Sequence, residues 1–380
     1  MSNEKKSPKL RFPGFTDAWE QRKLEKIASF SKGSGYSKSD LASSGIPLIL
    51  YGRLYTNYET VISNVNTFTG IEKKGSIFSK GCEVIVPASG ETAEDISVAS
   101  VVKQSGVILG GDLNIITPGK ELESMFLALN ITYGKPHNDM SKLAQGKSVV
   151  HLHNSDLKTI DILYPSILEQ KKISGFFSSL DNLITLQQRK CENLKKLKKG
   201  LLQKMFPKNG SNFPELRFPG YTDAWEQRKV KELFKVTRGY VLAATKTSSV
   251  QNDDMIYPVY SSQTKDNGLM GYYNEFLYSD AITWTTDGAN AGTVKYRKGK
   301  FYCTNVCGVL LENDVKPNKM LAEALDLIAP KHVSHVGNPK LMNNVMSEIE
   351  IRIPISNDER IKLSNLFETF DNIITLQQRK

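Results

Sequence analysis

The stretch DNLITLQQRK, residues 181–190, recurs as DNIITLQQRK at residues 371–380, with nine of ten positions identical. Apolar residues around each copy recur at alternating steps of three and four, which is typical of a long helix with a heptad seam. The seam passes through Ile173, Phe177, Leu180, Ile184, Gln187, Cys191 and Leu194 in the first copy, and through Leu363, Phe367, Phe370, Ile374 and Gln377 in the second. Because neither helix can bury its stripe alone, the two are expected to pack on each other.

The first of these helices is predicted to begin near Ser166, which follows Pro165 and can cap it. No strong helix breaker follows until Pro207, so the helix is a rod of about 60 Å. A single copy is compatible with an ordinary core helix, but two copies favour a spacer between two equivalent bodies. The basic run at residues 188–204 is interpreted as a solvated helix face, with DNA contact as the alternative.

A second repeat opens each half of the chain. LRFPGFTDAWEQRK at residues 10–23 matches LRFPGYTDAWEQRK at residues 216–229 in thirteen of fourteen positions. The chain is therefore a duplication of opener, body and helix. The openers and helices, which we call the frame, are nearly identical, whereas the two bodies hardly resemble each other. This contrast indicates that the frame does one job twice, while the bodies do related jobs on different targets.

The predicted fold class is α+β, because strand-like runs are scattered among helical ones without strict alternation. The expected strands are residues 47–52, 83–88, 96–102, 113–117, 257–262, 281–286, 292–297, 301–311, 160–165 and 349–354, with short helices at residues 122–130 and 320–327. The predicted division is an N-terminal segment 1–23, a first body 24–165, a central region with the spacer helix 166–229, a second body 230–354 and a C-terminal helix 355–380. The repeats also predict a pseudo-twofold axis between the two helices.

Composition restricts the class of partner. The 380 residues carry a net charge of +10 and a pI near 9.1, which favours an anionic partner such as nucleic acid over a basic balance that serves only solubility. No apolar run is long enough to span a membrane and no signal peptide is recognised, so a cytoplasmic location is expected. The four cysteines form no disulfide framework; Cys303 and Cys307 are expected to share the face of one strand as core thiols, and no metal site is predicted.

Motifs for catalysis are missing from the sequence. There is no phosphate-binding GxxxxGK[ST] loop, no dinucleotide-binding turn and no Asn-Pro-Pro-aromatic tetrapeptide of the kind that holds a flipped adenine. Ser89 in PASGET lacks a GxSxG elbow, and the sequence implies no histidine beside it. The chain is therefore expected to have no catalytic residues and to bind no cofactor itself.

Polar loops of the bodies supply candidate DNA contacts, since hydroxyl, amide and guanidinium groups can bond phosphates and base edges. Ordinary surface loops are the alternative. The candidates are Lys32, Ser34, Tyr36, Tyr51, Arg53, Tyr55, Ser89, Glu91, Thr92 and Lys147 in the first body, and Arg238, Tyr240, Ser261, Ser262, Gln263, Thr286, Asp287, Asn290, Lys295, Arg297 and Lys340 in the second.

The duplicated openers, the DNxITLQQRK helices, and segments such as YGRLYT and TDGANAGTVKYR resemble the specificity (S) subunit of type I restriction–modification systems. The resemblance covers nearly the whole chain. It implies two target-recognition domains, each reading one half of a split site in double-stranded DNA, and conserved helices that pack antiparallel. It also implies two modification subunits that methylate adenine with S-adenosylmethionine, and two restriction subunits that use ATP and magnesium.

The frame is the expected docking surface for the modification subunits, because two copies of one partner need two copies of one surface. The candidate residues are Phe12, Asp17, Trp19, Phe218, Asp223 and Trp225, with a core role as the alternative for the tryptophans. One departure from the family is that the chain continues for some sixteen helical residues after the first LQQRK but stops after the second, as in a shortened product. Two rival functions stay open: a self-sufficient methyltransferase or nuclease with diverged motifs, and a structural adaptor that binds no DNA.

Overall fold

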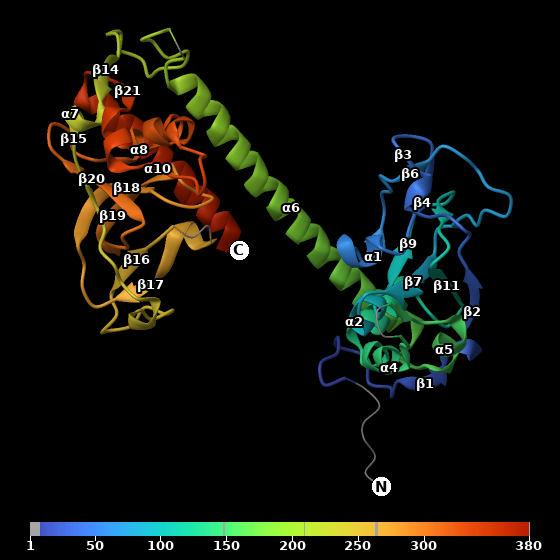
Figure 1. Ribbon diagram of the computed structural model, residues 1–380. Helices are drawn as coiled ribbons and strands as arrows, with labels where there is room; N and C mark the ends of the chain where they lie inside the picture. Colours follow the sequence, from blue (N-terminus) through green and yellow to red (C-terminus); the bar gives the residue numbers. More distant parts are fainter. Residues whose placement is uncertain (1–7, 147–148, 209, 263–264, 380) are drawn as a thin grey trace. The chain divides into compact units, whose positions relative to one another are not determined.

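The computed structural model describes residues 8–146, 149–208, 210–262 and 265–379. The chain forms two compact units, residues 1–183 and 184–380, which we call unit 1 and unit 2 (Figure 1). The long helix α6 (Ile167–Met205) begins in unit 1 and ends in unit 2. Its start one residue after Ser166 and its end just before Pro207 confirm the predicted long helix.

Unit 1 combines short strands with helices. Its strands are β1 (Glu20–Lys23), β2 (Ala28–Lys32), β3 (Leu41–Ala42), β4 (Ile46–Ile49), β5 (Val61–Ile62), β6 (Phe68–Thr69), β7 (Glu83–Pro87), β8 (Ser89–Gly90), β9 (Ser100–Val102), β10 (Ile108–Leu109), β11 (Leu113–Pro118), β12 (Val150–His151) and β13 (Asp161–Tyr164). Its helices before α6 are α1 (Arg53–Thr56), α2 (Ala93–Ile96), α3 (Ser124–Tyr133), α4 (Lys135–Leu143) and α5 (Asn154–Thr159).

The central sheet of unit 1 has the order β2-β11-β7-β9-β5, and a second sheet has the order β10-β4-β6-β3. Strand β7 is fully buried, because α3 packs on one face and the second core of unit 1 lies on the other. Val84 and Val86 therefore join one cluster, whereas Ile85 joins the other, as the alternation of side chains along a strand requires.

Unit 2 is built around one larger sheet. Its strands are β14 (Glu226–Lys229), β15 (Phe234–Arg238), β16 (Tyr257–Tyr260), β17 (Leu269–Tyr273), β18 (Tyr278–Thr285), β19 (Val294–Cys303), β20 (Cys307–Glu312) and β21 (Glu350–Ile353). Its helices besides α6 are α7 (Val230–Leu233), α8 (Lys319–Asp326), α9 (Asn343–Glu348) and α10 (Asn357–Arg379). Short 3-10 helices in the two units are η1 (Leu24–Lys26), η2 (Lys38–Asp40), η3 (Ala244–Lys246), η4 (Lys265–Gly268) and η5 (Ala329–His332).

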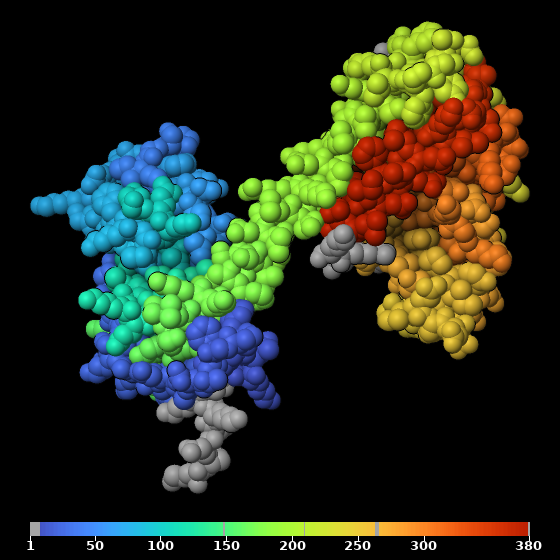
Figure 2. Space-filling model, turned by 180° about the vertical axis from the view of Figure 1, so that it is seen from behind, coloured from blue at the N-terminus to red at the C-terminus, as the bar shows by residue number. Residues whose placement is uncertain are grey.

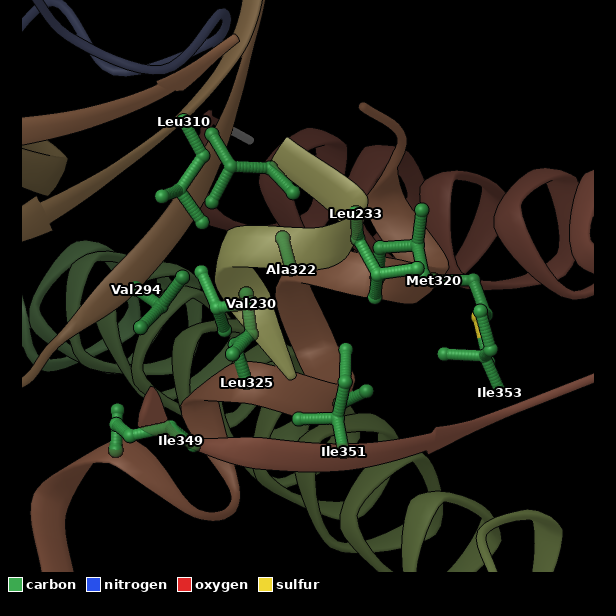
Figure 3. Packing of buried hydrophobic residues seen from close by; sticks show 14 of the residues in the cluster. Val230, Leu233, Val294, Leu310, Met320, Ala322, Leu325, Ile349, Ile351 and Ile353 are labelled. Carbon is green, nitrogen blue, oxygen red and sulfur yellow. The ribbon is translucent and has the colours of Figure 1, made fainter. Parts of the chain in front are cut away.

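The sheet of unit 2 has the order β15-β20-β18-β19-β16-β17. Its main core fills the space between β18–β20, the helix α8 and the strand β21, where Val294, Leu310, Met320, Leu325 and Ile351 converge (Figure 3). A smaller cluster that includes Phe301 and Val309 forms separately from this core. The two faces of the sheet therefore pack against different clusters. The candidate site lies on the face that carries Phe301 and Val309.

Within unit 2, α10 packs along the C-terminal half of α6 (Figure 2). The rings of Phe206 and Phe367 stack with centroids 5.8 Å apart, while Lys198 Nζ contacts Asp371 Oδ1 at 2.6 Å. Because the position rises along α6 as it falls along α10, the two segments run antiparallel. The antiparallel packing of the two helices is as expected, but α6 makes these contacts through residues 198–206, beyond its predicted seam, and Phe177, Leu180 and Ile184 of that seam are exposed.

Four charged side chains close the junction of α6, α8 and α10. Lys198 contacts Glu323 at 2.7 Å as well as Asp371, and Lys319 contacts both carboxylates at 2.9 and 2.5 Å. Burial opposes the charge on Glu323, but the two lysines hold the pKa of its carboxyl below the ordinary value. Two cations and two anions thus neutralise one another where three helices meet.

Each opener is fixed to the first turn of its helix by the same ion pair. In unit 1, Arg11 donates to both carboxylate oxygens of Glu169 at 2.8 and 2.7 Å, and in unit 2, Arg217 donates to those of Glu359 at 2.8 and 2.9 Å. Both carboxylates are buried. The strand that ends each opener also pairs antiparallel with the strand before the helix, β1 with β13 and β14 with β21.

Several sequence-based expectations need correction. Cys303 and Cys307 do not lie on one strand, because the chain turns between them and places Cys303 at the end of β19 and Cys307 at the start of β20. Both thiols are buried and free, and burial raises the pKa of Cys307 to about 11. Most of the strand expected at residues 96–102 is replaced by the end of α2 and a loop.

Removal of Arg217 should destabilise unit 2, because the buried Glu359 carboxylate would lose the guanidinium that donates to both of its oxygens. We expect R217A to lower the free energy of unfolding by about 3 kcal/mol, and R217A/E359Q to recover part of the loss. Urea unfolding followed by tryptophan fluorescence in a W19F background would measure this, since Trp225 and Trp284 both belong to unit 2. R228A, which removes a more exposed set of ion pairs, is the matched control and should cost less than about 1 kcal/mol.

Candidate nucleic-acid interface

The first polar loop of unit 1 is held by its own hydrogen bonds. The phenolic oxygen of Tyr36 accepts from the backbone N–H of Lys73 at 2.7 Å and bonds Ser76 Oγ at 2.6 Å, and the ring is buried. Ser34 Oγ accepts from the N–H of Ile77 at 3.1 Å. These two candidates therefore position the loop, whereas Lys32 at the end of β2 is exposed.

A second group of candidates lies around α1. The guanidinium of Arg53 donates to Glu59 at 2.5 Å and to Asn66 Oδ1 at 3.1 Å, so this arginine is already engaged within unit 1. The rings of Tyr51 and Tyr55 lie 6.2 Å apart. Burial, followed by the nearby Tyr51, raises the pKa of Tyr55. The two tyrosine side chains at this position are half-buried and contact each other.

Ser89 has a histidine beside it, contrary to the expectation from sequence. Its Oγ lies 3.0 Å from His151 Nδ1, because β8 and β12 pair antiparallel with these two residues opposite each other. The rings of His151 and His153 stack with centroids 6.4 Å apart. Next to this pair, Glu91 is exposed and Thr92 caps α2 by accepting the N–H of Asp95 at 3.1 Å.

Four candidates of unit 2, namely Ser261, Asn290, Lys295 and Arg297, meet around one recess of about 150 Å³. Arg297 is 7% exposed; its guanidinium lies 3.7 Å from the centre of the Tyr260 ring, and its Nε donates to Thr283 Oγ1 at 3.1 Å. Burial lowers the pKa of Arg297.

Trp284 forms part of the wall of this recess and is anchored by its indole N–H, which donates to the carbonyl of Leu341 at 3.0 Å. The ring passes directly over Gly308 of the neighbouring strand β20, where any side chain would collide with it. A glycine at residue 308 is therefore required for the Trp284 ring to occupy this position.

The remaining candidates of unit 2 are distributed around the recess. Thr286 donates to Asp287 at 2.7 Å, and Asp287 lies 3.8 Å from Lys340. Arg238 and Tyr240 are exposed, and the carbonyl of Ser262 accepts from Asn290 at 3.3 Å. Two candidates, Lys147 and Gln263, lie outside the described residues.

Sequence reasoning missed Tyr260 and Thr283, which contact Arg297. Alternate residues of paired strands share a face, and Thr283 is the direct cross-strand partner of Lys295. This alternation would have placed Thr283 beside Lys295 if the pairing of the two strands had been known. The pairing of β18 with β19 could not be read from either run by itself.

The frame candidates have matching burial in the two units except at the tryptophans. Asp17 and Asp223 are exposed, and Phe12 and Phe218 are half-buried. Trp225 is 1% exposed beneath Phe206, with ring centroids 5.8 Å apart, whereas Trp19 is half-buried against Phe126. Trp225 is therefore a core residue, which was the alternative to partner binding for the tryptophans.

Metal sites and membrane-spanning helices are both recognisable from the described ranges. No group of three or more His, Cys, Asp or Glu side chains among these residues could hold a metal ion. None of the helices within them is long and apolar enough to cross a membrane.

The frame is duplicated, and its two copies carry α+β bodies that differ from each other. Both bodies have polar side chains at their surfaces. These features define a class of protein with two separate recognition domains. The family model described as the type I restriction modification DNA specificity domain matches residues 16–196 and 222–380. The chain belongs to this family, so its function is DNA sequence specificity, and it is the non-catalytic type of subunit.

Individual relatives agree with this assignment. A type I specificity subunit N-terminal sequence of Mycoplasma pneumoniae is 41% identical over 145 residues, which are 37% of this chain and 75% of the relative. The specificity subunit of the type I restriction enzyme MpnII from the same organism is 38% identical over 133 residues, or 34% of this chain and 39% of the relative. The crystal structure of the S subunit from M. genitalium has the same fold, with a TM-score of 0.68, 16% identity and coverage of 98% of this chain and 94% of that one.

The buried hydroxyl of Tyr36 should matter for stability and the exposed hydroxyl of Tyr240 should not. We expect Y36F to destabilise the loop at residues 71–78 by about 1–2 kcal/mol, because the N–H of Lys73 loses its acceptor. Hydrogen exchange of this segment, measured by mass spectrometry, should accelerate. Y240F is the matched control, and equal exchange in the two variants would contradict the structural role of Tyr36.

Proposed function

We propose that unit 1 and unit 2 each read one half of a two-part sequence in double-stranded DNA, and that the frame fixes their separation. The observation that carries this proposal is the contrast between the units. The same Arg–Glu pair and the same two-stranded pairing recur in both, while the sheets that they hold differ in strand order. A repeated support with two different readers is what a two-part site requires.

The helix α6 is suited to set the separation. It has 39 residues, corresponding to about 58 Å at 1.5 Å per residue. A DNA duplex presents the same face about every 34 Å, so readers held by a rigid spacer must meet grooves at a fixed interval. Half-site identity would then reside in the bodies and spacer length in α6.

We further propose that the frame binds two modification subunits, one per repeat, which methylate adenine with S-adenosylmethionine. In the full assembly, two restriction subunits would add cleavage that depends on ATP and magnesium. Exposed frame residues support this assignment, among them Asp17 and Asp223 in the openers and the apolar side chain of Phe177 on α6, which is 42% exposed. The corresponding Phe367 of α10 is fully buried by its own unit. The methyltransferase or nuclease rival and the adaptor rival have no comparable observation in their favour.

Exchange of the first body should change one half-site alone. We expect that replacing residues 24–164 with the corresponding body of a relative alters one half of the methylated sequence, because base identity is read by side chains that only the bodies vary. Methylome sequencing of a host that carries the variant with its modification subunit supplies the measurement. A swap that altered both halves would show that reading is not divided between the units.

Lengthening α6 should change the spacer alone. We expect that inserting one or two helical turns between Leu183 and Leu194 increases the number of base pairs between the half-sites and keeps both sequences. The same methylome assay applies. The control replaces residues of this segment without changing the number of residues in the helix. If the insertion changed base identity at constant spacing, α6 would not be the element that measures distance.

A further inference from the structure

The charge of Arg297 has no acidic partner in the part of the chain that the structure describes. Its contacts there are the hydroxyl of Thr283 and the side chain of Tyr260, and none of the described carboxylates forms an ion pair with the guanidinium. The other arginines of comparable burial, Arg11, Arg53 and Arg217, each pair with a glutamate. Arg297 is therefore unusual within its own protein.

Burial of an unpaired cation is expensive, and an arginine cannot avoid the cost by losing its proton. The fold nevertheless keeps this side chain 7% exposed against an aromatic face. Such an arrangement is expected where the missing counter-charge arrives with a ligand. Lys295 stands two residues earlier on the same side of β19 and lines the same recess, so the site offers a second cation.

The size and lining of the recess restrict the ligand. A volume of about 150 Å³ is well below the 300 Å³ or more of typical cofactor pockets. None of the described residues around it is acidic, and hydroxyls of Thr283, Thr285 and Thr293 accompany the two cations. A small anion with several acceptor oxygens satisfies both kinds of group at once.

Two other ways of contacting DNA fit this geometry poorly. A recessed guanidinium is too deeply placed to reach a base edge inside the groove of an intact duplex. A base turned out of the duplex would need an aromatic face for stacking, and the Tyr260 face is already covered by Arg297. A protruding phosphate of the backbone meets neither obstacle.

We propose that this recess of unit 2 holds one backbone phosphate of the bound DNA, with Arg297 and Lys295 as its cationic ligands. This inference rests on the proposed function and adds an anchoring point that fixes the register of unit 2 on the duplex. Sequence would be read by other side chains of the unit, because phosphate contacts position a protein without carrying base identity.

The test compares R297M with the original chain in two measurements. Replacement of an unpaired buried charge by an apolar side chain of similar length should leave the melting temperature unchanged or raise it. On a mixed-sequence duplex, affinity should fall about tenfold, and the slope of log affinity against log salt should decrease by about 0.9, as expected for one lost phosphate. K235Q removes one exposed positive charge from β15, away from the recess, and serves as the control with a smaller effect.

A thermal shift with inorganic phosphate separates the possible outcomes. Phosphate should raise the melting temperature of the original chain and not that of R297M. A lower melting temperature of R297M without phosphate would mean that Arg297 is structural and would overturn the proposal. If the original chain binds DNA and R297M binds it with equal affinity and salt slope, the recess does not hold a backbone phosphate. Failure of the original chain to bind DNA at all would instead refute the proposed function on which the inference rests.

Discussion

The bidentate contact between an opener arginine and a buried glutamate is the constraint on which each unit depends. The glutamate occupies the first turn of a helix whose cap is Ser166 or Ser356, so the pair joins three features at one point: the opener, the cap and the helix. The next residue completes the joint, since the side chains of Gln170 and Arg360 both donate to a proline carbonyl just before the helix. Each body is thereby closed by its own ends.

Closure at the ends leaves the interior of each body free to differ. Unit 1 distributes its strands over two main sheets, whereas unit 2 assembles one sheet of six strands, yet both begin and end with the same two-stranded pairing. Only the joint has to be conserved between the repeats for both bodies to be held. A body of different sequence can therefore occupy the same support.

The sequence alone predicted the parts of the fold that rest on local signals. The start signal at Pro165 and Ser166 located the beginning of α6 to within a residue, and short strand-like runs located β7, β11 and β16. Pairing between distant segments was not accessible, which is why Cys303 and Cys307 were placed on one strand and why His151 was not expected beside Ser89. The burial of Trp225 also depends on Phe206, a residue outside the repeated opener.

The candidate site shows the same division between local and distant information. Polar loops identified four residues of the recess, because Gly, Ser and Asn in turns are a local signal. They could not distinguish Arg297, which lacks a carboxylate partner, from Arg53, which has Glu59, because that difference is made by residues brought together from several strands. Charge compensation is a property of the folded environment and not of the residue type.

The junction of α6 with α10 has a consequence for synthesis of the protein on the ribosome. Lys198 and its partner Asp371 are 173 residues apart in the chain. At about 5–20 residues per second, roughly 10–35 seconds separate the emergence of the two. During that interval Leu202, Met205 and Phe206 are in the nascent chain without the surface that buries them in the finished molecule. Folding of unit 2 therefore cannot proceed strictly from the N-terminus onward, because the end of α6 is buried only after the C-terminal helix has been made.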